Sequence, residues 1–296
     1  MKVLVTGGSG FIGKHLVKRL IERGDEVRVV DLNPFPDDSV DCVIGDLRDR
    51  STVHKALTPG FDAVVNLAAI TSVLQSVNDP EAVFNTNVLA THYLLEKCRE
   101  LNVNRFVLAS SNAVVGNVGR SIINENIPLQ PLTPYGSTKA AGEMLMSAYS
   151  ASYHMTTCAL RFTNIYGIGM QAKDSVVARM MKAALAGTGI QIYGDGSQMR
   201  DYLYVLDAVS SIELGLAIEK SNTLTIGLAR SVSMNELYEL TCQATGIEIK
   251  KEHIAAKQGE MPAVIVDNSK AKSLGFSIQY DLEKGLAATW EDFKNA

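Results

Sequence analysis

The sequence predicts an α/β fold, in which a doubly wound parallel sheet is joined to a smaller mixed α/β domain. Three observations predict it. A glycine-rich turn connects a strand to a helix at the amino terminus, strands and helices alternate over residues 1–165, and the texture of the chain changes beyond Asn164. The expected domains are therefore residues 1–165, with a returning segment near 200–228, and residues 166–296.

The amino-terminal segment has the form of a dinucleotide-binding fingerprint. A β-rich run, Lys2–Thr6, leads into Gly7-Gly8-Ser9-Gly10-Phe11-Ile12-Gly13, and helical spacing of apolar residues follows over Lys14–Ile21. The early glycines allow a tight turn and the approach of a pyrophosphate, and Gly13 lets the helix lie close to the strand. A glycine-rich hairpin is the alternative, but no second strand follows. The pattern therefore favours a sheet of Rossmann type.

The second strand indicates which dinucleotide is bound. Glu26–Val30 ends at Asp31, where a carboxylate can accept hydrogen bonds from the adenosine ribose. A carboxylate there repels the additional phosphate of NADP, so the sequence favours NAD. The alternative is an aspartate that forms a turn before Asn33-Pro34.

The remaining elements of the first domain continue the alternation. Asp79 with Pro80 forms a helix start, since proline fits the first turn and aspartate caps it. Ser110 and Ser111 follow a strand and lie at the carboxyl edge of the sheet, where ligands bind. The expected helices lie at 51–57, 79–101 and 135–154. The expected strands are Cys42–Asp46, Asp62–Ala69, Arg105–Ala109 and Thr157–Phe162, and Thr157–Phe162 is the sixth strand, which completes the sheet.

The second part of the chain has shorter elements. Glycine and polar residues interrupt it, and we expect helices at 175–186 and 207–217 with a strand and turn over Ile190–Gly196. Ser233 followed by Glu236 fits a capping box that opens a further helix.

The segment Pro134-Tyr135-Gly136-Ser137-Thr138-Lys139 carries the strongest chemical signal. Positions four apart share one face of a helix, so Tyr135 and Lys139 can point into one site. A free tyrosine has a pKa near ~10. A nearby cation favours the phenolate and lowers that pKa, which makes the group a base for a sugar or alcohol hydroxyl. Alone, such a pair is most often a surface helix pair.

Composition indicates the compartment and excludes several partners. The 296 residues carry a net charge of −4 with both signs interspersed, which argues against nucleic acid. No apolar stretch reaches the length of a membrane span, and Met1-Lys2 leads directly into the first strand without a signal peptide. Cys42, Cys98, Cys158 and Cys242 are widely spaced and read as reduced thiols of a cytoplasmic protein. The five histidines show no metal-ligand spacing, so no metal is expected.

With these residues in hand, the chain resembles the extended short-chain dehydrogenase/reductases. Within them it is most similar to the NAD-dependent nucleotide-sugar epimerase and dehydratase group, and to UDP-sugar 4-epimerases in particular. The matching motifs are Thr6 to Gly13, Gly45-Asp46-Leu47, Asn66 to Ala69, Asn87-Val88, Ser110-Ser111, Tyr135 to Lys139, Asn164 to Gly167, Gly194-Asp195-Gly196, Arg200-Asp201-Tyr202, Gly259-Glu260 and Asp267 to Ala271.

The resemblance implies roles for individual residues. Tyr135 is expected to be the base for the sugar O4 hydroxyl, with Lys139 as its electrostatic partner and ribose ligand and Ser111 as a second group on O4. The implied cofactor residues are Gly7, Gly10, Phe11, Ile12, Gly13, Asp31, Asp46, Leu47, Leu67, Ala68, Ala69, Asn87, Tyr135, Lys139 and Phe162. The implied substrate residues are Ser111, Asn164, Val177, Arg200, Lys257 and Val264. As alternatives, Phe162 and Val177 are plain core residues, Asn164 is a turn former and Val264 is an ordinary strand residue.

The chain also departs from the group's pattern. Val115 stands where tyrosine is usual, and Lys257 stands where an arginine commonly binds the diphosphate. Lysine keeps the charge but loses the bidentate fork. Val264 stands at the position that gates substrate size, where a bulky tyrosine excludes N-acetylated sugars; valine is expected to admit them.

The resemblance also narrows the reaction. Ser111 is followed by Asn112 and Ala113 rather than by the acidic pair of the dehydratases. We therefore expect an NAD-dependent 4-epimerase of a UDP-linked sugar that works through a 4-keto intermediate. The alternatives are a nucleotide-sugar dehydrogenase or reductase of the same family and a non-catalytic nucleotide-sensing protein.

The resemblance further implies a homodimer through the helices at 79–101 and 135–154. The apolar residues expected to serve this contact are Leu89, Tyr93, Leu94, Met144, Leu145, Ala148 and Tyr149, some of which must face their own sheet.

Overall fold

The computed structural model describes residues 1–256 and 261–295. They form two compact units, which are treated separately below. Unit 1 contains Met1–Asn117, Glu125–Phe162 and Val209–Thr225, and unit 2 contains Val118–Asn124, Thr163–Ala208 and Ile226–Ala296. The first unit is therefore built from three segments of the chain.

Unit 1 is organised around a seven-stranded sheet with the order β12-β7-β5-β4-β1-β2-β3. Parallel pairing joins β1 to β2 and β4, β2 to β3, and β5 to β4 and β7. The chain order reverses beside β1, which is the switch point of a doubly wound sheet. The predicted Rossmann-type fold is confirmed. The strands are β1 (Lys2–Thr6), β2 (Glu26–Asp31), β3 (Asp41–Ile44), β4 (Ala63–Asn66), β5 (Arg105–Ser111), β7 (Thr156–Phe162) and β12 (Asn222–Ile226).

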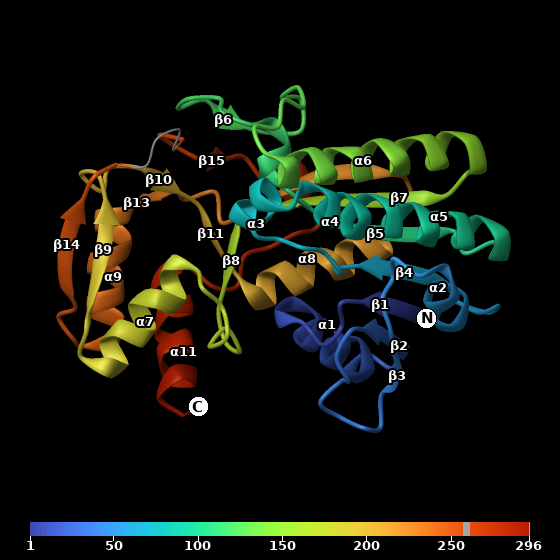
Figure 1. Cartoon of the computed structure of the whole chain (residues 1–296), viewed down its shortest axis with the longest axis horizontal. Helices are drawn as coiled ribbons and strands as arrows, with labels where there is room; N and C mark the ends of the chain where they lie inside the picture. The colour runs from blue at the N-terminus through green and yellow to red at the C-terminus, as the bar shows by residue number, and fades with distance from the viewer. Residues whose placement is uncertain (257–260, 296) are drawn as a thin grey trace. The chain divides into compact units, whose positions relative to one another are not determined.

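Helices cover both faces of this sheet (Figure 1). On one face lie α2 (Arg50–Ala56), α5 (Ala90–Leu101) and α6 (Pro134–Tyr153), whose apolar sides share one core with the strands. On the other face lie α1 (Phe11–Glu22) and α8 (Val205–Ala217), which are joined by an ion pair between Arg19 and Glu213 at 3.3 Å. Burial of Leu4, Val64 and Phe106, each 0% exposed, supplies the hydrophobic stabilisation of the sheet.

Two expectations for unit 1 are corrected. The single helix expected at 79–101 is divided into α4 (Pro80–Phe84), a π-helical segment (Asn85–Leu89) and α5, and a short helix, α3 (Val73–Asn78), precedes them. Asp79 caps α4 as predicted, because its side chain accepts a hydrogen bond from the Ala82 N–H at 3.0 Å. The sheet has a seventh strand, β12, beyond the six that were expected.

Unit 2 consists of short strand pairs and a cluster of helices. Helices α7 (Val176–Ala186), α9 (Met234–Thr245) and α11 (Leu282–Lys294) pack on one another, and α10 (Ser269–Ser273) is a single short turn. Ser233 caps α9 by accepting from the Glu236 N–H at 3.0 Å, as predicted. The strands pair as β6 (Ile122–Ile123) with β15 (Ile265–Val266), β8 (Asn164–Tyr166) with β11 (Tyr202–Tyr204), β9 (Gly189–Tyr193) with β14 (Lys250–Ile254), and β10 (Met199–Arg200) with β13 (Val232–Ser233).

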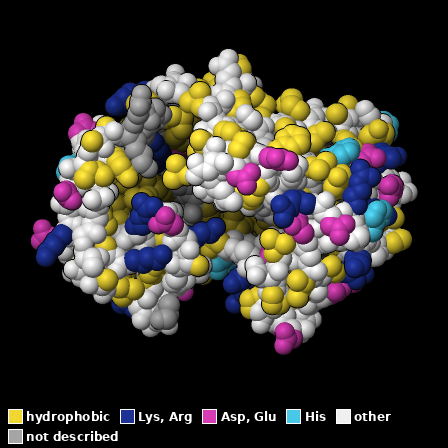
Figure 2. All heavy atoms as spheres, viewed as in Figure 1, with side chains coloured by type: hydrophobic (Ala, Val, Ile, Leu, Met, Phe, Trp, Pro, Cys, Tyr) yellow, Lys and Arg dark blue, Asp and Glu magenta, His cyan; other side chains and the backbone are white. Residues whose placement is uncertain are grey.

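Basic and acidic side chains are interspersed on the visible face of the molecule (Figure 2). Among residues 1–256 and 261–295, no helix combines the length and apolarity that a bilayer crossing requires. The same residues contain no group of three or more His, Cys, Asp or Glu side chains that could hold a metal ion.

Candidate functional site

The glycine-rich turn joins β1 to α1 at the carboxyl edge of the sheet. Gly7 has φ +68°, which favours glycine, and its carbonyl oxygen accepts from the Gly10 N–H at 3.0 Å. A Cβ atom on Gly13 would lie 2.3 Å from the Gly7 oxygen, so only glycine lets α1 approach the turn this closely. Gly10 provides no side-chain cap for α1, where Phe11 and Ile12 begin the helix. The helix N-terminus therefore faces the turn without a capping side chain, which suits an anionic ligand.

The two predicted acidic cofactor residues lie at the ends of neighbouring strands. The Asp31 carboxylate accepts from the Ser9 N–H at 3.1 Å and from the Asn33 N–H at 3.0 Å, so it fixes the glycine-rich turn as well as ending β2. Asp46 follows β3 and is held by Arg48, whose guanidinium donates to both carboxylate oxygens at 2.5–3.0 Å. This hydrogen bonding is the largest cause that holds the pKa of Asp46 below its usual value. Leu47, which lies between Asp46 and Arg48 in the sequence, is buried in the core.

The residues after β4 are fixed by a buried asparagine. The Asn87 side chain accepts from the Ile70 N–H at 2.8 Å and donates to the Ile70 carbonyl at 3.0 Å. It also donates to the Thr138 hydroxyl on α6 at 3.0 Å. Asn87 thereby connects α6 to the segment that contains Leu67, Ala68 and Ala69, all partly exposed. It lies in the π-helical segment that interrupts the regular helix, a feature that is frequent at functional sites.

The three residues predicted to be catalytic meet where β5 ends and α6 begins. Thr133 caps α6, and Tyr135 lies in its first turn. The Tyr135 phenol is hydrogen-bonded to the side chain of Ser111, the last residue of β5. The Lys139 ammonium donates to the Ala109 carbonyl at 2.8 Å and lies 6.0 Å from the centroid of the Tyr135 ring. Phe162 ends β7 directly opposite Ser111 and is buried.

The electrostatics of this group differ from the sequence expectation. Burial raises the pKa of Tyr135 above its usual value, and the hydrogen bond with Ser111 opposes that rise. Lys139 is not among the groups that change the pKa of Tyr135. Its own pKa is lowered to about 8, because its ammonium is buried. Proximity on one helix face therefore does not suffice to produce an acidic phenol, since desolvation is the larger effect.

Three of the predicted substrate residues are brought together within unit 2. Asn164, on β8, donates to the Asp201 carbonyl at 2.9 Å, which places it beside Arg200 on β10. The Val264 N–H donates to the Met199 carbonyl at 2.9 Å, so Val264 adjoins the same strand, and its side chain is 4% exposed.

Of the other three predicted substrate residues, Ser111 lies in unit 1 with Tyr135, and Val177 and Lys257 belong to neither group. Val177 is 1% exposed inside α7, which agrees with its alternative reading as a core residue. Lys257 and the Gly259-Glu260 motif lie outside the described residues.

Sequence reasoning missed a buried ion pair next to the catalytic group. Arg161 on β7 binds Glu143 on α6, with 2.7 Å between Nη2 and Oε2, and Ser110 donates to the same carboxylate. A signal was present, because Glu143 follows Lys139 by four residues and Arg161 interrupts an apolar strand.

Comparisons with known proteins identify the family and agree with the fold. Residues 3–227 match the model of the NAD-dependent epimerase/dehydratase family. The chain is 32% identical to a putative UDP-glucose 4-epimerase of Methanocaldococcus jannaschii over 99% of this chain and 98% of that protein.

Two solved structures are similar over the whole chain. The UDP-glucose 4-epimerase of Thermotoga maritima, solved with UDP-glucose, is 31% identical with a TM-score of 0.95, covering 100% of this chain and 99% of that one. MoeE5, solved with UDP-glucuronic acid and NAD, is 35% identical with a TM-score of 0.92 and the same coverage. These matches confirm the resemblance that the sequence motifs indicate.

Proposed function

The chain belongs to the NAD-dependent epimerase/dehydratase family, and on that premise we propose that it is a 4-epimerase of a UDP-linked hexose. The observation that carries the proposal is the contact between Ser111 and Tyr135 at the carboxyl edge of the sheet, with Lys139 one helical turn away. A base, a hydrogen-bonding hydroxyl and a cation are the groups that a reversible oxidation at C4 requires from the protein.

The residues of unit 1 fit NAD. Gly7 and Gly13 keep the turn free of side chains, α1 offers its N-terminus to the pyrophosphate, and Asp31 suits the ribose hydroxyls. When bound, NAD supplies a hydride acceptor that oxidises C4 and returns the hydride to the other face. In our proposal Tyr135 takes the O4 proton, Ser111 holds O4 by a hydrogen bond, and Lys139 stabilises the phenolate.

The segment after Ser111 favours epimerisation over dehydration. Asn112 and Ala113 begin a 3₁₀ turn, and the Ala113 N–H donates to the Ser111 hydroxyl at 3.2 Å. Neither side chain can act as the acid or base that elimination of water needs. In addition, we propose that the enzyme is a cytoplasmic homodimer. Support for the compartment comes from Cys42, Cys98, Cys158 and Cys242, which are all free thiols, as is usual in a reducing compartment.

The test is to incubate the protein with NAD and each of UDP-glucose, UDP-galactose, UDP-N-acetylglucosamine and UDP-glucuronic acid, and to follow the C4 epimers by NMR. Interconversion without accumulation of NADH supports the proposal. Stoichiometric NADH would instead identify a dehydrogenase, and binding without either product would identify a nucleotide-sensing protein.

Tyr135→Phe is the matched variant for this test. Loss of the base is expected to lower kcat by roughly 10²–10⁴ with NAD binding retained. Near-normal turnover in this variant would remove Tyr135 from the mechanism.

A further inference from the structure

Glu143 and Arg161 form a buried ion pair behind the catalytic group. Their side chains are 2% and 6% exposed, and Arg161 donates to both carboxylate oxygens, with 3.0 Å from Nε to Oε1 and 2.7 Å from Nη2 to Oε2. Ser110 donates to Oε1 at 2.5 Å and lies directly opposite Arg161 in the sheet. The cluster therefore joins β5, β7 and α6.

The same two elements, β5 and α6, carry the catalytic group. Three consecutive residues at the end of β5 contact three successive turns of α6. Ala109 accepts from Lys139, Ser110 donates to Glu143, and Ser111 is hydrogen-bonded to Tyr135. Tyr135, Lys139 and Glu143 are four residues apart, so they lie on one helix face. A rotation of α6 about its axis would disturb all three contacts together.

This ion pair is poorly suited to a purely stabilising role. Burying two charges is costly, and apolar side chains of similar volume often serve stability equally well or better. In addition, Nη1 of Arg161 is buried and has no hydrogen-bond partner among the described residues. What the pair provides is direction, because a bidentate guanidinium–carboxylate contact fixes the relative orientation of its two partners.

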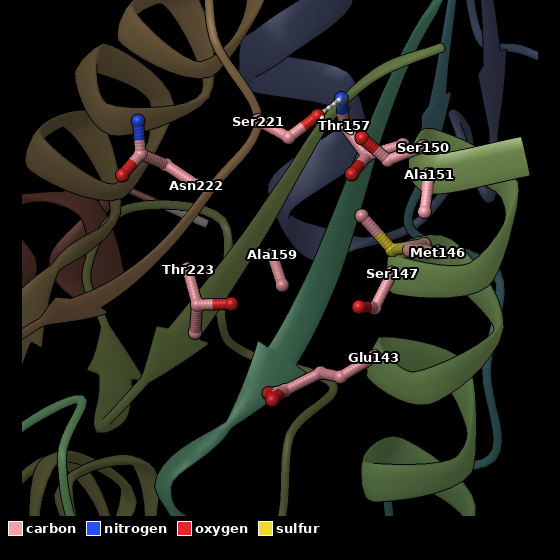
Figure 3. Close-up of a pocket in the computed structure, with 10 residues that line it drawn as sticks. All are labelled: Glu143, Met146, Ser147, Ser150, Ala151, Thr157, Ala159, Ser221, Asn222 and Thr223. Carbon is pink, nitrogen blue, oxygen red and sulfur yellow. Dashed lines mark hydrogen bonds between the residues drawn. The ribbon is translucent and has the colours of Figure 1, made fainter. Parts of the chain in front are cut away.

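The packing around α6 shows why a directional contact is needed on this side. Met146 and Tyr149 of α6 pack into the core that α5 shares. Toward β7 and β12 the helix also borders a groove of about 330 Å³, as Figure 3 shows. The groove is lined by Glu143, Met146, Ser147, Ser150, Ala151, Thr157, Ala159, Ser221, Asn222 and Thr223. Glu143 is the charged residue of this lining and points from α6 toward the strands.

We propose that Glu143 and Arg161 are positioning residues that set the rotation of α6 and thereby align Tyr135 with Ser111. The role of Tyr135 in this inference rests on the proposed function. Among the described residues, the side-chain hydrogen bonds of the two positioning residues join them to each other and to Ser110, not to Tyr135. Their effect is expected on the rate of the chemical step and on the acidity of Tyr135, because the Ser111 hydrogen bond is what opposes the rise of its pKa.

The experiment uses Glu143→Gln and the double variant Glu143→Leu/Arg161→Met, with Glu100→Gln as the control. Glu100 forms an exposed ion pair with Lys97 on α5, away from the catalytic group. The double variant removes both charges, so it is expected to keep much of the wild-type thermal stability even where the single variant loses it. Tm, NAD affinity, kcat and KM are measured for each.

Both Glu143 variants are expected to lower kcat by about 10- to 100-fold, since a small misplacement of a catalytic group has effects of this size. KM and NAD affinity are expected to change little, and Glu100→Gln is expected to behave as wild type. A double variant that recovers both stability and kcat would show that the pair is merely structural and would overturn the proposal.

A second readout does not depend on epimerase activity. Tyrosine labelled with carbon-13 at Cζ is titrated by NMR, and the Tyr135 signal is assigned with Tyr135→Phe. The Tyr135 pKa is expected to rise further in both Glu143 variants. An unchanged Tyr135 pKa in folded variants would contradict the positioning role. If the wild-type protein epimerises none of the UDP-sugars, the proposed function fails, yet this titration still decides the inference.

Discussion

The ammonium of Lys139 and the carbonyl of Ala109 are hydrogen-bonded at 2.8 Å, within a site that leaves Lys139 5% exposed. This contact turns the lysine toward the end of β5 rather than toward water. Burial disfavours its charged form and lowers its pKa to about 8, which is low enough to matter in an ordinary assay.

We therefore predict that activity falls as the pH rises through about 8. The ammonium is present below that pKa and is lost above it, so the stabilisation of a Tyr135 phenolate is lost on the alkaline side. The measurement is the pH profile of kcat/KM. Lys139→Met is expected to lower activity and abolish the alkaline limb, whereas persistence of that limb in the variant would assign it to another group.

The cofactor preference depends on Asp31. We predict tighter binding of NAD than of NADP, because the carboxylate repels the additional phosphate and accepts from the ribose. Asp31→Asn keeps an acceptor for the Ser9 N–H and removes the charge, so it is expected to narrow the preference. Fluorescence titration with both dinucleotides measures the two affinities. The control is Asp62→Asn, because the Asp62 carboxylate also accepts from a backbone N–H, that of Lys2. Equal affinities in the wild type would refute the ribose–carboxylate argument.

The glycine turn offers a steric test. In Gly13→Ala the new Cβ would lie 2.3 Å from the Gly7 oxygen and 2.6 Å from the Gly8 Cα, and both are backbone atoms. Overpacking of this kind costs about 1–3 kcal/mol, so NAD affinity is expected to fall by about 10-fold or more. Calorimetric titration with NAD measures the change. Lys18→Ala, on the exposed side of α1, is the control; an unaltered affinity in Gly13→Ala would show that the turn does not shape the cofactor site.

Substrate size is tested at Val264. We predict that the protein accepts UDP-N-acetylhexosamines and that Val264→Tyr depresses their turnover much more than that of UDP-glucose and UDP-galactose. Because Val264 is 4% exposed, Tm is measured alongside kcat/KM to detect overpacking. Val264→Leu is the control, with a smaller change in volume. Equal losses for both substrate pairs would show that Val264 does not gate the site.

Assembly is tested on the outer side of α6. Met144 is 55% exposed there, whereas Leu94 and Tyr149, also among the expected contact residues, are buried in the core of their own protomer. We predict a homodimer in which Met144 is covered, so Met144→Glu is expected to yield monomers by light scattering. Leu185→Glu, at an exposed site on α7, is expected to leave the mass unchanged. A monomeric wild type would refute the dimer.

The sequence predicts this fold well where the signals are local. The glycine turn at Gly7–Gly13, the apolar period of α1 and the cap at Asp79 each involve neighbouring residues, and each element forms where expected. The strand β12, Asn222–Ile226, was missed because its pairing partner, β7, is distant in sequence. The π-helical segment was also missed; its Asn87 is hydrogen-bonded to Ile70 and Thr138, which are distant in sequence.

The site follows the same pattern. Spacing alone predicts that Tyr135 and Lys139 share a face, and the structure has them so. Spacing does not reveal that burial raises the pKa of Tyr135 or that Arg161 faces Glu143, because both depend on which strands lie beside α6.

The position of β12 late in the sequence has a consequence for folding during synthesis. Its strand is synthesised some way after β7, so an emerging chain that stops at residue 165 has β7 as an open edge with unpaired N–H and C=O groups. Such edges pair readily with other chains. During synthesis the first unit is thus incomplete until unit 2 has been partly translated, which exposes it to misassembly for longer than its own length suggests. A chain truncated near residue 165 would keep the β7 edge unpaired permanently. A protein designed to contain the first unit alone should therefore include residues 209–225.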